Sequence, residues 1–195
     1  MISPTVLAVI DELEAFQKNH SDSWNIPREE GMILHTVAIA ARCRYLVEVG
    51  TSYGFSGLFL GSAAAENGGV LHTFDRDPRK HEHAAANFRR AGLEATIRLH
   101  TADAMVELAR LDNGIDLAFI DATKSQTPGY WKLLEPRLAA SCVVAVDNTG
   151  THRRELAPFV EMLRNRGDFT CCDVPVGNGF ELAVRMAKPH DVGNV

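Results

Sequence analysis

The sequence predicts an α/β fold, in which helices cover both faces of a mostly parallel sheet. Five short apolar runs alternate with amphipathic segments after residue 44, and this alternation is typical of parallel strands joined by helical crossovers. Two further short strands flank a Gly-Asn-Gly turn at 177–179, which predicts a C-terminal antiparallel β-hairpin. Two helical patterns precede the first run. We therefore expect seven strands and extra N-terminal helices.

The N-terminal region, residues 1–43, has the pattern of two helices. Ser3 can cap the first helix, Pro4 suits its first position, and an apolar stripe runs through residues 6–16. This stripe is expected to pack either within the chain or against a second subunit. After a polar break, the second helix opens at Pro27 with two glutamates in its first turn, where the helix dipole favours acidic side chains.

The remaining elements follow one another in regular alternation. The expected strands lie at 45–49, 70–74, 96–99, 115–120, 142–146, 169–174 and 180–186. The expected helices between them lie near 56–66, 79–91, 103–110, 127–138 and 153–166. No linker separates two domains, so residues 44–188 are expected to form the core of a single domain that spans 1–195.

Length and composition describe a globular protein with an acidic balance. The chain has 195 residues, of which 46% are hydrophobic and 23% charged, so disorder is excluded and about 70% of the unfolded surface can be buried. No apolar run approaches the about 20 residues of a membrane-spanning helix, and the N-terminus lacks the pattern of a signal peptide. We therefore expect a cytoplasmic protein without a membrane partner. The net charge is −5 with no basic stripe, which argues against nucleic acid as a partner.

A glycine-rich turn follows the first expected strand. It reads Glu48-Val-Gly50-Thr-Ser-Tyr-Gly54-Phe-Ser56-Gly57. In open α/β sheets, ligands bind beyond the carboxyl ends of the strands, where glycines let the backbone approach a ligand and the next helix offers free N–H groups. The spacing is G-x-x-x-G, which disfavours the G-x-G-x-x-G pyrophosphate loop of a nicotinamide-dependent dehydrogenase. A tight strand-to-helix turn without a ligand is the other interpretation.

Aspartates follow the second and third expected strands. Asp75 stands where an acidic residue can accept both hydroxyls of a ribose, and the alternative is a helix cap. Asp77 suits the cap better, because Pro78 would then occupy the first helical position. Asp103 could either cap a helix or reach an adenine edge.

Oxygen ligands and a lysine follow the fourth and fifth expected strands. Asp121, Asp147 and Asn148 provide two carboxylates and an amide, which suit a hard divalent cation such as Mg²⁺ if the two strands are neighbours. Lys124 lies three residues after Asp121, and a nearby cation would disfavour its ammonium form, which suits a general base. In the other interpretation, Asp121 binds the edge of a cofactor and Lys124 is a solvated lysine at a helix start.

In this order and spacing, the motifs resemble those of the catechol-type, cation-dependent O-methyltransferases that use S-adenosylmethionine. The similarity runs from about Pro27 to Lys188 and implies a Rossmann-like fold. The matching segments are Val47-Glu-Val-Gly-Thr-Ser-Tyr-Gly-Phe-Ser56, Asp116-Leu-Ala-Phe-Ile-Asp-Ala-Thr-Lys124, Val146-Asp-Asn148 and Val174-Pro-Val-Gly-Asn-Gly-Phe-Glu-Leu-Ala-Val184. Members of this family are commonly dimers, so the resemblance also implies a homodimer.

The resemblance implies a role for each matching residue. The residues expected to bind S-adenosylmethionine are Glu48, Gly50, Thr51, Ser52, Tyr53, Gly54, Ser56, Asp75, Arg76, Asp103, Ala104 and Asp121, with Ile26 as a further contact. The expected ligands of a divalent cation, Mg²⁺, are Asp121, Asp147 and Asn148, and the expected catalytic residues are Asp121 and Lys124, with Lys124 as the base. The implied reaction is an in-line methyl transfer to a hydroxyl of a small aromatic or vicinal-diol acceptor that the metal holds.

Three segments depart from the family pattern. Thr123 stands where the family often has aspartate, residues 139–141 replace the usual Pro-Gly-Gly, and no tryptophan follows Asn148. His152 follows Asn148 closely and is a candidate for the acceptor pocket, whereas Tyr130-Trp131 is expected to pack in the core. The acceptor therefore stays open. Two other functions also stay open: a metal-independent methyltransferase on the same fold, and a non-catalytic protein that binds the cofactor.

Overall fold

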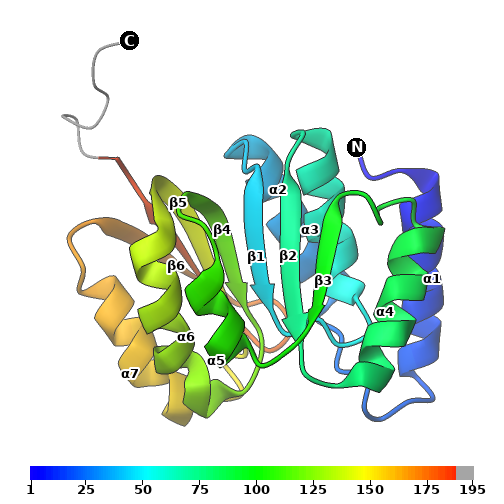
Figure 1. Cartoon of the computed structure of the whole chain (residues 1–195). Coiled ribbons are helices and arrows are strands. Elements are labelled where there is room, and N and C mark those ends of the chain that lie inside the picture. The colour runs from blue at the N-terminus through cyan, green and yellow to red at the C-terminus, as the bar shows by residue number, and fades with distance from the viewer. Residues whose placement is uncertain (188–195) are drawn as a thin grey trace.

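A central seven-stranded sheet with helices on both faces organises the chain into three layers (Figure 1). The computed structural model describes residues 1–187, so the expected end of the core at residue 188 lies just outside the described residues. The α/β fold, the mostly parallel sheet and the C-terminal hairpin are confirmed.

The strand order is β3-β2-β1-β4-β5-β7-β6, and β7 runs antiparallel to both of its neighbours. The strands are β1 (Tyr45–Val49), β2 (Val70–Asp75), β3 (Ile97–Thr101), β4 (Ile115–Ile120), β5 (Leu138–Asp147), β6 (Phe169–Val174) and β7 (Phe180–Arg185). The order reverses between β1 and β4, and ligands bind at this point in sheets of this kind. The carboxyl ends of β1 to β5 point downward in Figure 1, so the turns that follow them share one edge.

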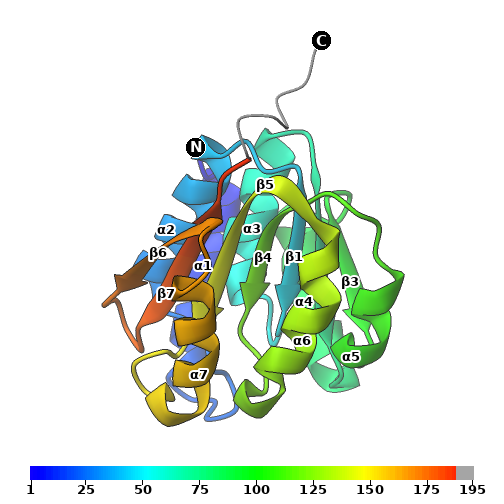
Figure 2. The same cartoon turned by 90° about the vertical axis from the view of Figure 1, so that its left-hand side faces the viewer.

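Helices α1 to α4 cover one face of the sheet, and α5 to α7 cover the other (Figure 2). Their bounds are α1 (Pro4–Gln17), α2 (Arg28–Ala40), α3 (Phe55–Glu66), α4 (Pro78–Arg90), α5 (Ala104–Glu107), α6 (Thr127–Leu134) and α7 (Arg153–Arg164). The helix expected over 103–110 divides into α5 and a 3₁₀ turn, Leu108–Arg110. Within residues 1–187, no helix is long and apolar enough to cross a membrane.

The N-terminal helices begin at the positions that local signals predict. The Ser3 side chain accepts the Val6 N–H at 3.2 Å and caps α1. Arg28, the first residue of α2, forms ion pairs with Asp11 and Glu14 of α1. The apolar stripe of α1 packs against α3 and α4, so the stripe belongs to the core of this chain.

Strand β5 is longer than expected, and α6 is correspondingly shorter. The helix expected over 127–138 ends at Leu134, because Pro136 has no N–H to donate to the α-helical hydrogen bonds, and the chain continues as a 3₁₀ turn from Glu135. After one 3₁₀ turn, β5 begins at Leu138, which pairs with Ile115 of β4. This pairing joins residues far apart in the sequence, so the local apolar pattern did not indicate it.

Candidate active site

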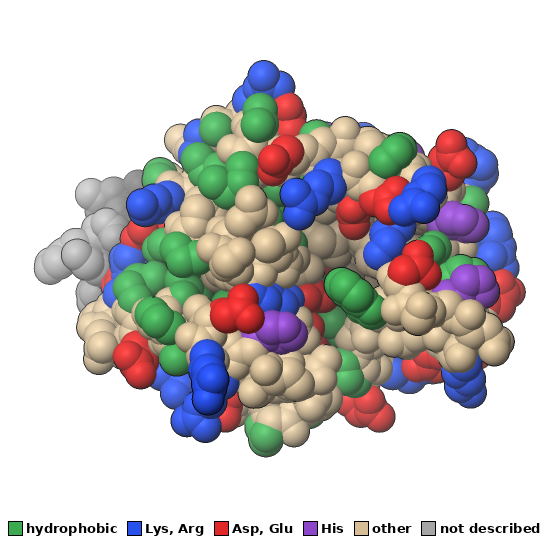
Figure 3. Space-filling view, turned by 90° about the horizontal axis from the view of Figure 1, so that it is seen from below, with side chains coloured by type: hydrophobic (Ala, Val, Ile, Leu, Met, Phe, Trp, Pro, Cys, Tyr) green, Lys and Arg blue, Asp and Glu red, His purple; other side chains and the backbone are tan. Residues whose placement is uncertain are grey.

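A cavity of about 760 Å³ opens at the carboxyl ends of the parallel strands. Figure 3 looks onto this edge, where the surface is hollowed near its centre and charged side chains of both signs border the hollow. Five Asp or Glu side chains and three Lys or Arg side chains line the cavity, so its balance is acidic. Of the residues expected at the site, the cavity is lined by Ile26, Gly50, Thr51, Ser52, Ser56, Asp75, Arg76, Asp103, Ala104, Asp121, Lys124, Asp147, Asn148 and His152.

The glycine-rich turn after β1 forms one wall of this cavity. Gly50 has a φ of +114°, and a Cβ built there would lie 1.9 Å from the backbone oxygen of Asp121. The Gly50 and Thr51 N–H groups both donate to the carbonyl of Phe74 at the end of β2, over 3.0 and 3.2 Å. Ser52 follows with a φ of +48°. The turn therefore packs backbone against backbone, which only glycine permits at position 50.

Aspartates after β2 and β3 both orient local backbone and line the cavity. The Asp75 carboxylate accepts the Ser52 N–H at 2.7 Å and the Asp77 N–H at 2.9 Å, which fixes its orientation in the cavity wall. Asp77 caps α4, as predicted. Asp103 caps α5 by accepting the Met105 N–H at 2.9 Å, and it lines the cavity as well. Its two interpretations are therefore compatible.

Glu48, Tyr53 and Gly54 lie outside the cavity lining, although the resemblance implied cofactor contacts for them. Glu48 is fully buried, and its Oε2 accepts the Thr73 hydroxyl at 2.5 Å, while its Oε1 has no hydrogen-bond partner within residues 1–187. The Tyr53 hydroxyl donates to Asp22 at 2.8 Å. Glu48 therefore lies behind the turn, whereas Tyr53 and Gly54 belong to the turn itself and lead into α3.

Replacing Glu48 with Gln is expected to make the cofactor-free protein more stable at alkaline pH. Burial raises the pKa of Glu48 from 4.5 to about 7, so the folded state holds this proton more tightly than the unfolded state does. The stabilisation is complete below pH 4.5 and is lost as the pH rises through 7. Glutamine mimics the protonated form and removes this loss. The unfolding midpoint of Glu48→Gln relative to wild type should therefore rise by about 5–10 °C between pH 4 and pH 8.

A matched control for this measurement is Glu94→Gln, which removes an exposed carboxylate. Its midpoint relative to wild type should change little over the same pH range. If the difference in unfolding midpoint between Glu48→Gln and wild type did not change with pH, the raised pKa of the buried Glu48 carboxyl would be refuted.

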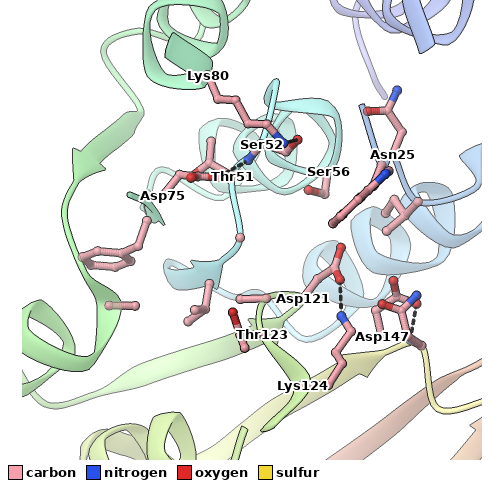
Figure 4. A pocket seen from close by; sticks show the side chains of 18 of the residues that line it. Asn25, Thr51, Ser52, Ser56, Asp75, Lys80, Asp121, Thr123, Lys124 and Asp147 are labelled. Atoms are coloured by element: carbon pink, nitrogen blue, oxygen red, sulfur yellow. Dashed lines mark hydrogen bonds and ion pairs between the residues drawn. The ribbon is translucent and has the colours of Figure 1, made fainter. Parts of the chain in front are cut away.

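The turns after β4 and β5 bring Asp121, Lys124 and Asp147 into the same part of the cavity (Figure 4). The Lys124 ammonium donates to the Asp121 carboxylate at 2.7 Å, and both side chains are mostly buried. Asp147 is 2% exposed and accepts the Asn148 N–H at 2.6 Å. Burial and the neighbouring Asp121 carboxylate raise the pKa of Asp147. Asn148 has a φ of +67°, a conformation that asparagine tolerates better than most residues.

A third carboxyl group, Glu30, lies behind this cluster. It belongs to the first turn of α2, is fully buried, and neither of its carboxylate oxygens has a hydrogen-bond partner among the described residues. Burial and the facing carboxylates of Asp147 and Asp121 raise the pKa of Glu30. Sequence reasoning assigned Glu30 only to the helix dipole, because nothing local indicates that α2 packs beside the end of β5.

The donor set of the cluster fits a hard divalent cation. Asp121, Asp147 and Asn148 offer only oxygens from side chains that reach one cavity, and oxygens are the preferred ligands of Mg²⁺. Glu30 places two further oxygens beside them that have no hydrogen-bond partner among the described residues, and its raised pKa favours the neutral acid when no cation is bound. Within residues 1–187, no three His, Cys, Asp or Glu side chains are gathered so as to hold an ion by themselves. A cation here would therefore need the Asn148 amide and further oxygens from outside the chain.

Several lining residues were not found from the sequence. Trp24 and Asn25 reach the cavity from the segment between α1 and α2, and Lys80 reaches it from α4. Arg76 donates to the Thr123 hydroxyl at 3.0 Å, so the residue that departs from the family pattern anchors a cavity side chain. The sequence offered one signal for this part of the cavity wall, because Trp24 is a single aromatic residue in the polar break before Pro27.

The two aromatic residues expected in the core have different positions. Trp131 is 5% exposed and packs edge-on against Phe159, with ring centroids 5.6 Å apart, as predicted. Tyr130 is also buried, but its side chain reaches the cavity wall and donates to Gln126 at 2.7 Å.

Comparison with known proteins agrees with this geometry. Residues 47–149, which contain the glycine-rich turn and the cluster around Asp121 and Asp147, match the family model described as a methyltransferase domain. A putative O-methyltransferase of Mycolicibacterium vanbaalenii is 39% identical over an alignment of 172 positions, and the match covers 80% of this chain and 74% of that protein. The chain belongs to the O-methyltransferase family.

Two further family members support this assignment. The catechol O-methyltransferase of Mycobacterium tuberculosis is 34% identical over an alignment of 136 positions, and the match covers 66% of this chain and 60% of that protein. This chain therefore matches less than two thirds of that relative's length. The O-methyltransferase TomG of Streptomyces achromogenes, solved in complex with SAM (S-adenosylmethionine), superposes with a TM-score of 0.81 at 26% identity, over 91% of this chain and 89% of TomG.

Proposed function

We propose that this O-methyltransferase family member transfers the methyl group of S-adenosylmethionine to a hydroxyl of a small aromatic or vicinal-diol acceptor, assisted by a divalent cation. One observation carries the proposal. The turn expected to hold the cofactor packs directly on the Asp121 backbone, and the Asp121 side chain pairs with Lys124 in the same cavity. A ligand on the turn would therefore lie beside a base and a set of oxygen ligands.

The proposed cofactor contacts are the expected residues that line the cavity. Asp75 has a fixed carboxylate that suits the two ribose hydroxyls, and Asp103 with Ala104 borders the proposed adenine end. The acidic balance of the cavity favours a sulfonium cation. Glu48 would act on the methionine part only through the turn it supports.

The proposed metal ligands are Asp121, Asp147 and Asn148. A bound Mg²⁺ would supply Lewis acidity, which lowers the pKa of an acceptor hydroxyl. Lys124 is the proposed acceptor of the hydroxyl proton, because it lines the cavity and Asp121 is placed to hold the ammonium form at 2.7 Å. The ammonium would first have to release its own proton to solvent, which a cation bound beside it would favour. The walls formed by the turn and by the strand ends would hold the hydroxyl in line with the methyl group.

Removing divalent cations is expected to stop methyl transfer without releasing the cofactor. Labelled S-adenosylmethionine would be incubated with a panel of vicinal dihydroxy acceptors, with EDTA or with Mg²⁺, and cofactor affinity would be measured by calorimetry under both conditions. Turnover should fall at least about 100-fold with EDTA and return with Mg²⁺. Cofactor affinity should change little.

The other outcomes distinguish the alternatives. Unchanged turnover with EDTA would identify a metal-independent methyltransferase. Cofactor binding without product from any acceptor would favour a non-catalytic binding protein. We also propose a homodimer, in line with the family, and light scattering would test it.

A further inference from the structure

Two histidines face each other on neighbouring strands of the sheet, and we call them the histidine pair. His72 of β2 and His100 of β3 are half-buried, and neither ring lines the cavity. The Nδ1 atom of His72 lies 3.1 Å from the Nε2 atom of His100, the ring planes differ by 17°, and the ring centroids are 5.2 Å apart. The rings therefore meet edge to edge in a hydrogen bond, in which one neutral imidazole donates its N–H and the other accepts it.

His100 also stacks on Phe74, which belongs to the cavity wall. The ring centroids of His100 and Phe74 are 4.5 Å apart, and the ring planes differ by 11°. Phe74 is 2% exposed and lines the cavity with Ala102 and Ala104, at the end proposed for adenine. Its carbonyl accepts the first two N–H groups of the glycine-rich turn. Phe74 thus connects the histidine pair both to the wall and to the turn that are proposed to hold the cofactor.

The hydrogen bond from His72 holds the His100 ring in one orientation. The last torsion of a histidine side chain has a broad minimum, so His100 needs a partner in its ring plane to keep a fixed position against Phe74. Tyr45 of β1 packs edge-on against His72, with centroids 5.5 Å apart. Burial raises the pKa of the Tyr45 phenol, so this neighbour carries no charge near neutral pH.

The surroundings of the histidine pair limit the number of protons it can hold. Burial lowers the pKa of both histidines, and each positive charge would oppose the other. Arg98 of β3 also opposes a charge on His72, whereas Asp112 favours one there and Glu107 of α5 favours one on His100. One added proton leaves a donor and an acceptor between the rings. A second added proton removes the acceptor and places two cations side by side.

We propose that the histidine pair positions the adenosine part of the cofactor, because its internal hydrogen bond holds Phe74 in the cavity wall until both rings are protonated. This inference rests on the proposed function, since it assumes that the cavity binds S-adenosylmethionine. The two histidines touch neither the cofactor nor the acceptor and act through Phe74. Cofactor affinity should therefore fall at acidic pH through two residues that lie outside the cavity.

Replacing His72 with Asn separates the hydrogen bond from its titration. The Asn amide takes the place of the imidazole Nδ1 and can donate to His100 or accept from it at any pH. Calorimetry would measure the affinity for S-adenosylhomocysteine in wild type, His72→Asn and His72→Ala over a pH series from 7.5 to 4.5. Wild type should weaken at least about tenfold more than His72→Asn over this series. His72→Ala should already bind about fivefold more weakly than wild type at pH 7.5, because it lacks the bond.

The matched control is His83→Asn, which removes an exposed histidine from α4. Its affinity should follow that of wild type at every pH. The unfolding midpoint of the cofactor-free protein gives a second measurement over the same series. Because the folded state binds protons on the histidine pair less tightly than the unfolded state, its stabilisation is complete above pH 6.5 and is lost as the pH falls. His72→Asn should lose less stability than wild type, and His83→Asn should not differ from it.

The outcomes separate the histidine pair from the reaction. The same pH dependence of affinity in wild type and His72→Asn, or an equal loss of affinity at pH 7.5 in His72→Asn and His72→Ala, would overturn the positioning role and leave the proposed function standing. The expected pH dependence without methylated product from any acceptor would support the histidine pair and refute the proposed reaction. Absence of S-adenosylhomocysteine binding at every pH would refute both.

Discussion

Asp147→Ala is expected to abolish methyl transfer, by at least about 10³-fold in kcat, while cofactor affinity stays close to that of the wild type. Asp147 ends β5 at the far side of the cavity from the glycine-rich turn, and its carboxylate is one of only two among the proposed metal ligands. Without it, neither a cation nor the acceptor hydroxyl would be held beside Lys124.

Three measurements check this prediction. Product formation gives kcat, calorimetry gives the affinity for S-adenosylmethionine, and Mn²⁺ titration followed by electron paramagnetic resonance gives the cation affinity. Asp173→Ala, which removes an exposed carboxylate from β6, should change none of the three. A strong loss of S-adenosylmethionine affinity in Asp147→Ala would place Asp147 in the cofactor site and refute its role as a metal ligand.

The stability of the same variant provides a separate check. Burial and Asp121 raise the pKa of Asp147, so the ionised carboxylate is unfavourable in the folded protein without a cation. Removing it should not lower the unfolding midpoint at pH 8 in EDTA. A large destabilisation would mean that Asp147 serves mainly to hold the Asn148 backbone.

Gly50→Ala is expected to lose cofactor binding and several kcal/mol of stability. The added Cβ would lie 1.9 Å from the Asp121 carbonyl oxygen, and the backbone φ of +114° is one that alanine rarely adopts. The atoms that the added Cβ would meet, the carbonyl oxygen and carbon of Asp121, belong to the backbone and cannot rotate away. The turn and the end of β4 must therefore move apart. We expect the free energy of unfolding to fall by at least about 3 kcal/mol, measured by urea denaturation.

Gly68→Ala is the matched control for this prediction. Gly68 also has a positive φ, +68°, but a Cβ there would meet nothing within 4 Å. Its cost should be limited to backbone strain, about 1 kcal/mol, with normal S-adenosylmethionine affinity. If Gly50→Ala bound the cofactor as tightly as Gly68→Ala, the close packing of the turn on β4 would not matter for the site.

The sequence predicted the strands of the fold better than their ends. Buried parallel strands are continuous apolar runs, so each run identified its strand without knowledge of its neighbours. The beginning of β5 was missed, because Leu138 is held in the sheet by pairing with Ile115 and not by a local apolar run. The segment expected as a helix at 103–110 was shortened by a 3₁₀ turn for which no local signal exists.

The residues of the candidate site divide in a similar way into those that the sequence predicted and those that it did not. Side chains at the ends of β1 to β5 could be assembled from the sequence, because parallel strands place their carboxyl ends at one edge. Glu30 and Trp24 could not, since they come from the N-terminal region and reach the site only through the packing of α2 and the segment before it. Glu48 shows the opposite case, a motif residue that folding places behind the cavity.

By itself, the sequence determined the α/β architecture, the position of the glycine-rich turn, and the polar residues that end each parallel strand. These features follow from local patterns, such as a continuous apolar run or the cap of a helix by Asp77, whereas the need for glycine at position 50 comes from its packing on the distant Asp121 backbone. Only the tertiary structure decided which carboxyls face one another, that Lys124 pairs with Asp121, and that Trp24 and Glu155 share a cavity. Those facts depend on how helices pack across the sheet, where burial and charge between distant residues decide the outcome.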